Sequence, residues 1–426
     1  FTPGIKHTGI VTDAAVAPTC TTPGLTEGSH CATCGTVIVK QETILANGHS
    51  APEYINNGAT HSGVYPCCGA THVTGEAHTY YDGVCICGAV EEQPVVKPTI
   101  TLKYPTLSFE SEVFYNVYFT ASNTADVEEM GLITWYTKPA SQNAAVVENA
   151  EAIIPGAVYN AGNDTYMARS QGIPAKQLGD NLYLRVYAKL SDGTYVYSSV
   201  QRYSAKSYAA DILKNSSNPD MKALVVSMLN YGAAAQVHFN HNTDKLMNAG
   251  LTPEQKALVV PYSDSMISSL VAVDKTKTTN FVYNKGFSDG YPSVSFEGAL
   301  AINYYLIPKY EVTGDFTLYC WDLATYNSVS VLTEDNATAT ATMSQASSSY
   351  VGAFAGLAAK QIDETVFVAG VYTSGGVRYS SPVISYSLGE YCKDQIANGS
   401  ETMKEFAKHT AVYGYYAENY FASLNG

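Results

Sequence analysis

Apolar and polar residues alternate along much of the chain after residue 96, which is the pattern of β-strands with one buried face. The alternation first predicts strands over residues 100–121, 130–137, 165–169, 181–190 and 193–203. It returns over residues 281–283, 293–307, 316–321, 328–332, 337–343, 365–372 and 377–386. Turn sequences such as Asp192-Gly193 separate the strands. Several short strands at this spacing predict β-sandwiches.

Helical patterns follow each set of strands. Ser204 is placed to cap a helix that ends near residue 213, and Asn218-Pro219-Asp220 has the cap, proline and acid of a second helix start. The sequence Thr252-Pro-Glu-Gln255 is similar to a capping box and predicts a short connecting helix. The later stretch predicts helices over residues 391–396 and 401–423.

These strands and helices belong to two copies of one sequence. Each copy contains a Trp, then a Gly-x-x-Ala-Lys-Gln segment, then a Tyr-Gly pair inside the last helix. The landmarks are Trp135, Gly172 and Tyr231 in the first copy, and Trp321, Gly356 and Tyr413 in the second. Self-similarity of this kind indicates a duplicated structural unit. We therefore predict a mainly β chain with appended helices, in which residues 96–277 and 278–426 are tandem copies of a β-sandwich-plus-two-helix domain.

Residues 1–95 differ in composition from the two copies. Seven of the nine cysteines and six of the nine histidines lie there. The segment is poor in large apolar residues, so it cannot bury much core and needs a cross-link. We expect zinc in a small zinc-ribbon-like region, and disulfides remain the alternative. The other two cysteines, Cys320 and Cys392, have no counterparts in the first copy, and we expect them to be buried free thiols.

The first predicted zinc site is built around a knuckle sequence. Cys31-Ala-Thr-Cys34-Gly35 has the form of a tight turn that presents two thiolates. Cys20 lies upstream and His49 downstream, and together they complete a closed Cys3His set. Because the set contains no carboxylate to hold water on the metal, it predicts a structural zinc rather than a catalytic one.

A second, contracted version follows in the sequence. Its knuckle is replaced by two adjacent cysteines, which are poorly placed to bind one ion together. Its predicted ligands are His61, Cys67, Cys68 and His78. A truncated third unit contributes Cys85 and Cys87, which are alternative ligands for the second site, as is His72. We expect His7 and His30 to bind no metal.

The Cys/His-rich segment also resembles a known class of protein. The run from Ala17 to Gly35, with Asn47-Gly-His49 and the sequence from His78 to Cys85, resembles a repeat common in surface proteins of anaerobic clostridia and their gut relatives. The helical Asn-Tyr-Gly-Ala-Ala-Ala-Gln segment at residues 230–236 resembles parts of similar large, modular, secreted proteins. The resemblance implies an extracellular or cell-surface location and a modular architecture, and it supplies no catalytic residues.

Charge and motifs exclude several functions. The formal net charge of −14 argues against nucleic-acid binding, which depends on neutralising phosphates. No run of about 18 apolar residues predicts a membrane span. The sequence lacks the P-loop, dinucleotide-binding and His-Glu-x-x-His motifs. Glu110 and Glu297 are equivalent in the repeat, but one carboxylate per copy is not a glycosidase pair. We therefore expect no enzymatic activity.

The remaining interpretation is a structural protein that self-assembles into a surface filament or layer. Residues 1–19 are placed to pair with the sheet edge of a neighbouring chain. The small surface of Gly232-Ala-Ala-Ala and the bulky surface of Gly414-Tyr-Tyr are complementary, and they pack either within one chain or between chains. The alternative function is a carbohydrate-binding adhesin, with Trp135 and Trp321 as glycan anchors if they are exposed.

Overall fold

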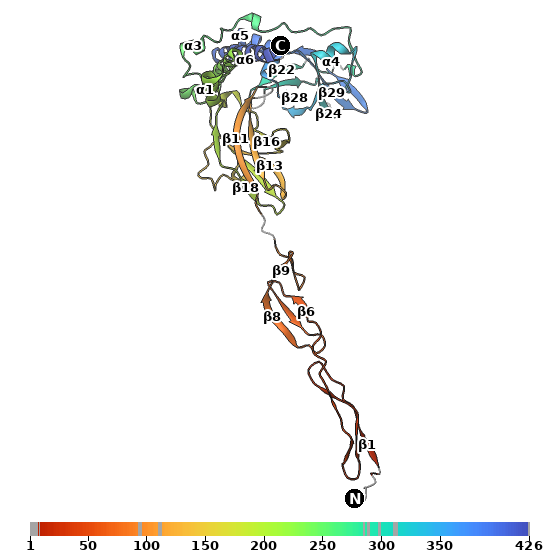
Figure 1. The fold of residues 1–426 in the computed structure, drawn as a ribbon. Helices are drawn as coiled ribbons and strands as arrows, with labels where there is room; N and C mark the ends of the chain where they lie inside the picture. Colours follow the sequence, from red (N-terminus) through yellow and green to blue (C-terminus); the bar gives the residue numbers. More distant parts are fainter. Residues whose placement is uncertain are drawn as a thin grey trace. The chain divides into compact units, whose positions relative to one another are not determined.

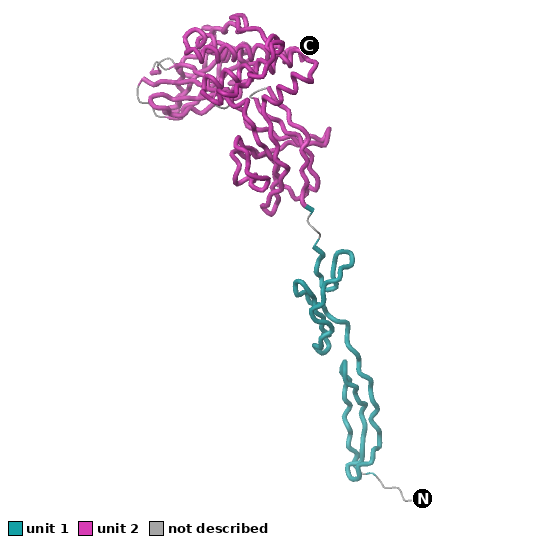
Figure 2. The backbone as a smooth tube through the Cα atoms, turned by 90° about the vertical axis from the view of Figure 1, so that its left-hand side faces the viewer, with its two compact units in different colours: residues 1–96 teal, residues 97–426 magenta. Residues whose placement is uncertain are grey.

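The computed structural model describes residues 7, 9–92, 96–109, 113–283, 286–287, 290–296, 300–309 and 314–424. The chain divides into two compact units, Phe1–Val96 and Lys97–Gly426 (Figure 2). Glu110 and Glu297 lie outside the described residues. Within the described ranges, no helix has the length and apolar character that crossing a membrane requires.

The first unit is a succession of small antiparallel sheets (Figure 1). The first sheet has the order β1 (Ile10–Asp13), β3 (Gly28–Cys31) and β4 (Val37–Val39), and β2 (Gly24–Leu25) pairs with β5 (Thr43–Ile44). The next sheet has the order β6 (Glu53–Asn56), β7 (Thr60–Val64) and β8 (Thr71–Ala77), and β9 (Tyr80–Tyr81) pairs with β10 (Val84–Cys85).

This unit has almost no hydrophobic core. Among its described residues, the buried apolar side chains are Cys31, Cys85 and Ala89. Many of its valines and isoleucines are exposed instead. Because burial of apolar surface is the main force that stabilises small domains, sheets this poor in buried side chains need another source of stability.

The first sandwich of the second unit consists of a four-stranded sheet and a five-stranded sheet that face each other. The former has the order β11 (Thr99–Ser108), β12 (Phe114–Ser122), β16 (Thr165–Arg169) and β15 (Val158–Asn160). The latter has the order β14 (Ala152–Pro155), β13 (Val127–Trp135), β17 (Leu182–Leu190) and β18 (Tyr195–Tyr197), with β19 (Gln201–Tyr203) also pairing with β17. The short helix η2 (Ala175–Gln177) precedes β17, and α1 (Ala205–Asn215) and α2 (Pro219–His238) follow β19. The connecting helix is α3 (Pro253–Lys256).

The second sandwich has the same plan. Its four-stranded sheet has the order β22 (Tyr291–Ser295), β23 (Ala301–Leu306), β28 (Ser349–Ala355) and β27 (Ser344–Ala346). The facing sheet has the order β21 (Val282–Tyr283), β30 (Val377–Ser380), β29 (Val366–Ser374), β24 (Asp315–Asp322) and β26 (Ala339–Thr342), with β31 (Ile384–Tyr386) also on β29. Strand β20 (Thr278–Thr279) pairs with β25 (Val331–Leu332). The helices are α4 (Leu323–Ser328), η5 (Ala359–Gln361), α5 (Leu388–Asn398) and α6 (Glu401–Leu424).

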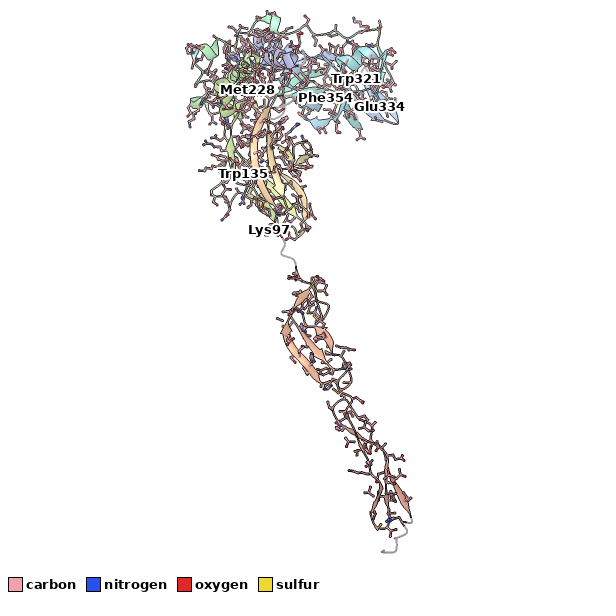
Figure 3. All side chains as sticks on the ribbon, in the orientation of Figure 1. Lys97, Trp135, Met228, Trp321, Glu334 and Phe354 are labelled. Carbon is pink, nitrogen blue, oxygen red and sulfur yellow. The ribbon has the colours of Figure 1, made fainter. Side chains whose placement is uncertain are left out.

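The tandem repeat of a β-sandwich with two helices is therefore confirmed. The order β11-β12-β16-β15 recurs as β22-β23-β28-β27, and β14-β13-β17-β18 recurs as β26-β24-β29-β30. The two tryptophans, labelled in Figure 3, are both buried. Each indole N–H has an acceptor: Trp135 donates to the Asn149 carbonyl at 2.6 Å, and Trp321 donates to Asn336 Oδ1 at 2.9 Å. Burial removes both rings as exposed glycan anchors.

The last helices of the two copies, α2 and α6, pack against each other inside the second unit. The rings of Tyr231 and Tyr413, which occupy equivalent positions in the repeat, stack with centroids 5.1 Å apart. Phe406 of α6 lies 5.5 Å from the Tyr231 ring. Residues of both copies join one hydrophobic core. The two helices therefore meet within one chain, through the rings of Tyr231, Tyr413 and Phe406.

Each of these helices also packs a glycine against the short helix of its own copy. A Cβ atom added at Gly414 would lie 2.6 Å from Ile362 Cδ1 and 2.8 Å from Ile362 Cβ. One added at Gly232 would lie 2.4 Å from Met247 Sδ, and 3.6 Å from the Ala175 carbonyl and from Leu178 Cβ. Cys320 and Cys392 are both buried and free, as the sequence analysis expected.

We predict that Gly414→Ala lowers the free energy of unfolding of the second unit by about 1–3 kcal/mol, the usual cost of overpacking. This cost exceeds the gain of about 1 kcal/mol that alanine brings to a helix interior. Guanidinium unfolding followed by tryptophan fluorescence measures the change, because both tryptophans are buried in this unit.

Gly232→Ala is the matched control. There the close contact is with the end of a flexible methionine, which can move aside, so the loss of stability is smaller. A Gly414→Ala protein as stable as the Gly232→Ala protein would contradict the packing described.

Candidate metal centres

Three short turns present the cysteine pairs of the first unit, and a similar backbone bond closes each turn. A glycine with a φ angle between 71° and 84° follows each pair. Its N–H donates to a carbonyl three or four residues earlier: Gly35 to Cys31 at 2.9 Å, Gly69 to Tyr65 at 2.8 Å, and Gly88 to Cys85 at 2.8 Å. Glycine adopts this left-handed conformation without strain, so the Cys-Gly sequence itself forms the turn.

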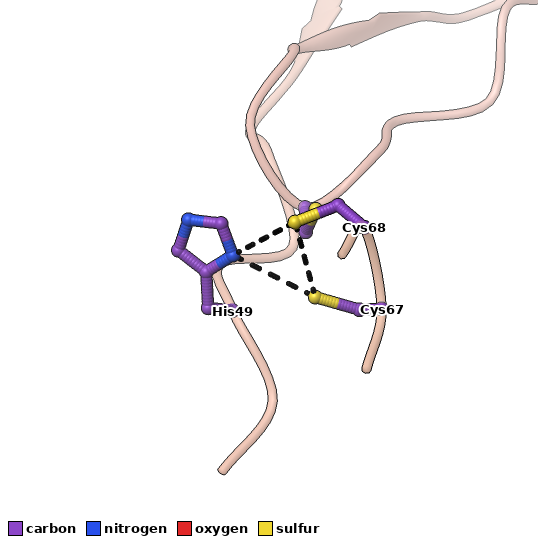
Figure 4. A group of neighbouring side chains, drawn as sticks. His49, Cys67 and Cys68 are labelled. Atoms are coloured by element: carbon purple, nitrogen blue, oxygen red, sulfur yellow. Dashed lines mark hydrogen bonds between the residues drawn. The ribbon is translucent and has the colours of Figure 1, made fainter. Parts of the chain in front are cut away.

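The first cluster consists of Cys20, His49, Cys67 and Cys68. Their ligand atoms lie within 4.8 Å of one another. His49 Nδ1 is 3.4 Å from Cys68 Sγ and 3.6 Å from Cys67 Sγ, and the two sulfurs are 3.9 Å apart (Figure 4). A backbone bond of 2.9 Å from Asn47 N–H to the Thr19 carbonyl holds the Cys20 and His49 segments side by side.

The second cluster consists of His61, His78, Cys85 and Cys87, again within 4.8 Å of one another. His78 Nδ1 lies 3.4 Å from the sulfurs of both Cys85 and Cys87. Cys85 Sγ also lies 3.6 Å from His61 Nδ1. His61 and Cys85 are buried, so half of this cluster is shielded from solvent.

These separations match the edges of a zinc tetrahedron. Zn–S bonds of about 2.3 Å and Zn–N bonds of about 2.0–2.1 Å give edges of about 3.8 Å between two sulfurs and about 3.5 Å between sulfur and nitrogen. The measured distances are 3.9 Å and 3.4–3.6 Å. A disulfide requires about 2.05 Å between sulfurs, and all nine cysteines are free. The two clusters can therefore hold a metal ion.

Neighbouring groups orient the histidines for this role. His78 Nε2–H donates to the Gly58 carbonyl at 2.8 Å, which leaves the lone pair of Nδ1 free to face the cysteines. His61 Nε2 lies 3.7 Å from the Glu76 carboxylate. The His49 ring stacks on Tyr65 with centroids 4.1 Å apart. Metal-binding histidines commonly have a carbonyl or carboxylate on the second nitrogen, because it fixes the tautomer and the ring.

Hydrogen bonds also prepare some of the sulfurs as thiolates, the form that binds metal. The backbone N–H of Ser50, with His49, lowers the pKa of Cys67 to about 6. The backbone N–H of Cys87 lowers the pKa of Cys85 to about 6. Cys20 behaves in the opposite way, because its thiol donates to Cys68 and Cys67, which raises its pKa to about 11.

The structure groups the predicted ligands differently from the sequence analysis. Cys31 and Cys34 do not join Cys20 and His49; they lie with His7, which the sequence analysis had set aside. Likewise Cys67 and Cys68 do not join His61 and His78, which lie instead with the alternative ligands Cys85 and Cys87. The reason is the β3–β4 hairpin, which carries the Cys31 turn at its tip, whereas Cys20 and His49 lie beyond its open end.

The two other candidate histidines have different partners. His72 Nδ1 bonds the Tyr65 hydroxyl at 2.8 Å, so the rival ligand of the second site is engaged elsewhere. His30 Nδ1 lies 2.8 Å from Asp13 Oδ1 in an ion pair. His7 was missed because no knuckle pattern precedes it in the sequence. The available signal was that a histidine precedes each of the later cysteine pairs, as His49 precedes Cys67 and His78 precedes Cys85.

Comparison with known proteins gives little to set beside this geometry. No family model and no curated protein matches the chain. Among solved structures, a DUF3823 family protein from Bacteroides ovatus is similar over 46% of this chain and 97% of its own, at 13% identity and a TM-score of 0.19. At that TM-score, neither the fold nor the function of this chain rests on the similarity.

We predict that pairs of ligand substitutions will separate the two groupings. Cys20→Ser combined with Cys67→Ser should remove one bound ion, because both residues lie in the first cluster. Cys67→Ser combined with His78→Gln should remove two, because these residues lie in different clusters. Native mass spectrometry of the zinc-loaded chain counts the ions.

Loss of a single ion in the Cys67→Ser, His78→Gln protein would contradict the structural grouping. His72→Gln is the control, since its partner is Tyr65, and we expect it to retain every ion.

Proposed function

We propose that this chain is a non-enzymatic, extracellular structural protein that is stapled by zinc and whose sheet edges mediate self-assembly. The staples join three Cys/His units, which are Cys20 to His49, His61 to His78, and the truncated pair Cys85 and Cys87. The observation that carries the proposal is the pair of outer strands in the first sheet, β1 and β4. Both expose apolar side chains, among them Ile10 and Val37, which are 62% and 60% exposed.

An exposed apolar edge is a feature that monomeric proteins usually avoid. Unpaired backbone groups on such a strand can pair with a second chain, and natural sequences block them with charges, prolines or bulges. Strand β4 is Val37-Ile38-Val39, and all three residues are exposed. No charged residue interrupts the strand, so a second copy of this chain can extend the sheet through β-augmentation.

The metal staples support a structural role. Each cluster takes one pair of ligands from one Cys/His unit and a cysteine pair from the next unit along the chain. Closed sets of Cys and His bind zinc for stability, whereas a catalytic zinc keeps a position for water. Zinc is the metal proposed here because it favours tetrahedral thiolate and imidazole ligands. The resemblance to clostridial surface repeats favours an extracellular location.

Because both tryptophans are buried, the adhesin alternative depends on tyrosines instead. The rings of Tyr291 and Tyr305 stack with centroids 4.8 Å apart on the β22–β23 pair, and Tyr291 is 49% exposed. Flat aromatic surfaces of this kind suit sugar rings. A glycan array probed with the chain tests this alternative, and binding lost in Tyr291→Ala would favour it.

For self-assembly, we predict that Val37→Lys combined with Val39→Lys abolishes the association of the chain, because paired lysines on an edge strand repel a second edge. Analytical ultracentrifugation and negative-stain microscopy of the zinc-loaded chain measure the association. Val260→Lys is the matched control, because Val260 is 53% exposed and lies outside any strand. A chain that is monomeric before any substitution would overturn the assembly proposal.

For the staples, we predict that chelation unfolds residues 20–87 and leaves residues 97–426 folded. The first unit buries almost no apolar surface, whereas the second has its own core. Hydrogen exchange with mass spectrometry, with and without chelator, should show loss of protection confined to the first unit. Protection that persists there in metal-free protein would show that another force holds the unit together.

A further inference from the structure

A third group of metal-ligating side chains lies at the tip of the β3–β4 hairpin. It consists of His7, Cys31 and Cys34, whose ligand atoms lie within 4.8 Å of one another. Cys34 Sγ is 3.4 Å from His7 Nδ1, which matches a sulfur–nitrogen edge of the other clusters. A backbone bond of 2.9 Å from Ala32 N–H to the Gly9 carbonyl holds the segment after His7 beside the turn. Three of the four ligands of a tetrahedral metal site are therefore present.

The other two clusters follow one rule for the order of their ligands, and this rule indicates which ligand the third group lacks. Each combines the cysteine pair of one Cys/His unit with two outer ligands of the preceding unit: Cys20 and His49 with Cys67 and Cys68, and His61 and His78 with Cys85 and Cys87. By this rule, His7 is the second outer ligand for the pair Cys31 and Cys34. The missing ligand corresponds to Cys20 in the first cluster and to His61 in the second, which precede His49 and His78 in the chain.

Nearby residues do not supply this ligand. Residues 1–6 and Thr8 include no Cys, His, Asp or Glu. His30 is adjacent to Cys31 but bonds the Asp13 carboxylate at 2.8 Å. Among the described residues, the group comprises these three ligands only. Cys31 is buried, whereas His7 and Cys34 are exposed, so the group lies at the protein surface.

We propose that His7, Cys31 and Cys34 form a third metal site with one open position, which is completed by a thiolate or imidazole from a Cys/His unit outside residues 1–426. Such a donor would join that unit to this chain through the same kind of shared ion that joins the two units inside it. The inference rests on the proposed zinc staples but not on self-assembly through the sheet edges.

The test uses the full chain loaded with Co²⁺, whose d–d absorption reports the ligands of a tetrahedral site. Free imidazole serves as the probe for the fourth ligand. We expect three ions per chain in the presence of imidazole. The absorption of one ion should change as imidazole is added, and that ion should bind about tenfold more tightly, equivalent to about 1.4 kcal/mol. Cys34→Ser should remove this ion and its response while leaving the other two.

His30→Gln is the matched control, because His30 neighbours the site but has its own partner, and it should retain all three ions. The closed clusters report separately on the staples: if they also bind no metal, the zinc proposal itself fails. Two ions per chain even with imidazole would overturn the third site. A third ion whose spectrum ignores imidazole would show a closed site. Metal-dependent dimers without imidazole would place the donor in a second copy of residues 1–426 and would overturn the proposed external unit.

Discussion

The ligand tetrahedra of the first unit are the constraint on which its structure depends. Its described residues bury three apolar side chains, and two of these, Cys31 and Cys85, belong to ligand groups. Conformational entropy opposes the ordering of every residue in these small sheets. With so little hydrophobic burial to offset this cost, bonds from sulfur and nitrogen to a metal ion held in these clusters would be the strongest remaining interactions, and metal binding and folding would become one event.

The way in which the ligands are shared gives the staples a second consequence. A conventional closed site stabilises one loop or one small domain, whereas each cluster here takes its ligands from two consecutive Cys/His units. The Cys67 turn binds back to the segments of Cys20 and His49, and the Cys85 turn binds back to His61 and His78. Ions bound in both clusters, as proposed, would therefore order consecutive segments of the chain one after another. A chain of units linked in this way can be extended without a larger core.

The second unit is stabilised by the opposite means. Its two sandwiches and their helices share a hydrophobic core, and the equivalent residues Tyr231 and Tyr413 stack at the junction between the copies. Helices α2 and α6 pack on each other within one chain, which covers their facing surfaces. Because those surfaces are occupied, the exposed edges of β1 and β4 in the first unit are the better candidates for assembly.

The sequence by itself determined the local structure and the chemistry of the ligands. Alternation, capping residues and the repeated Trp, Gly-x-x-Ala-Lys-Gln and Tyr-Gly landmarks predicted two copies of one sandwich, because these signals act over a few residues. The Cys-Gly turns likewise follow from local backbone preference. Only the tertiary structure decided which ligands meet. The β3–β4 hairpin separates Cys31 and Cys34 from Cys20 and His49, and a distance across a hairpin depends on pairing between strands rather than on spacing along the chain. For the same reason, only packing could show that both tryptophans are buried and that α2 meets α6 within one chain.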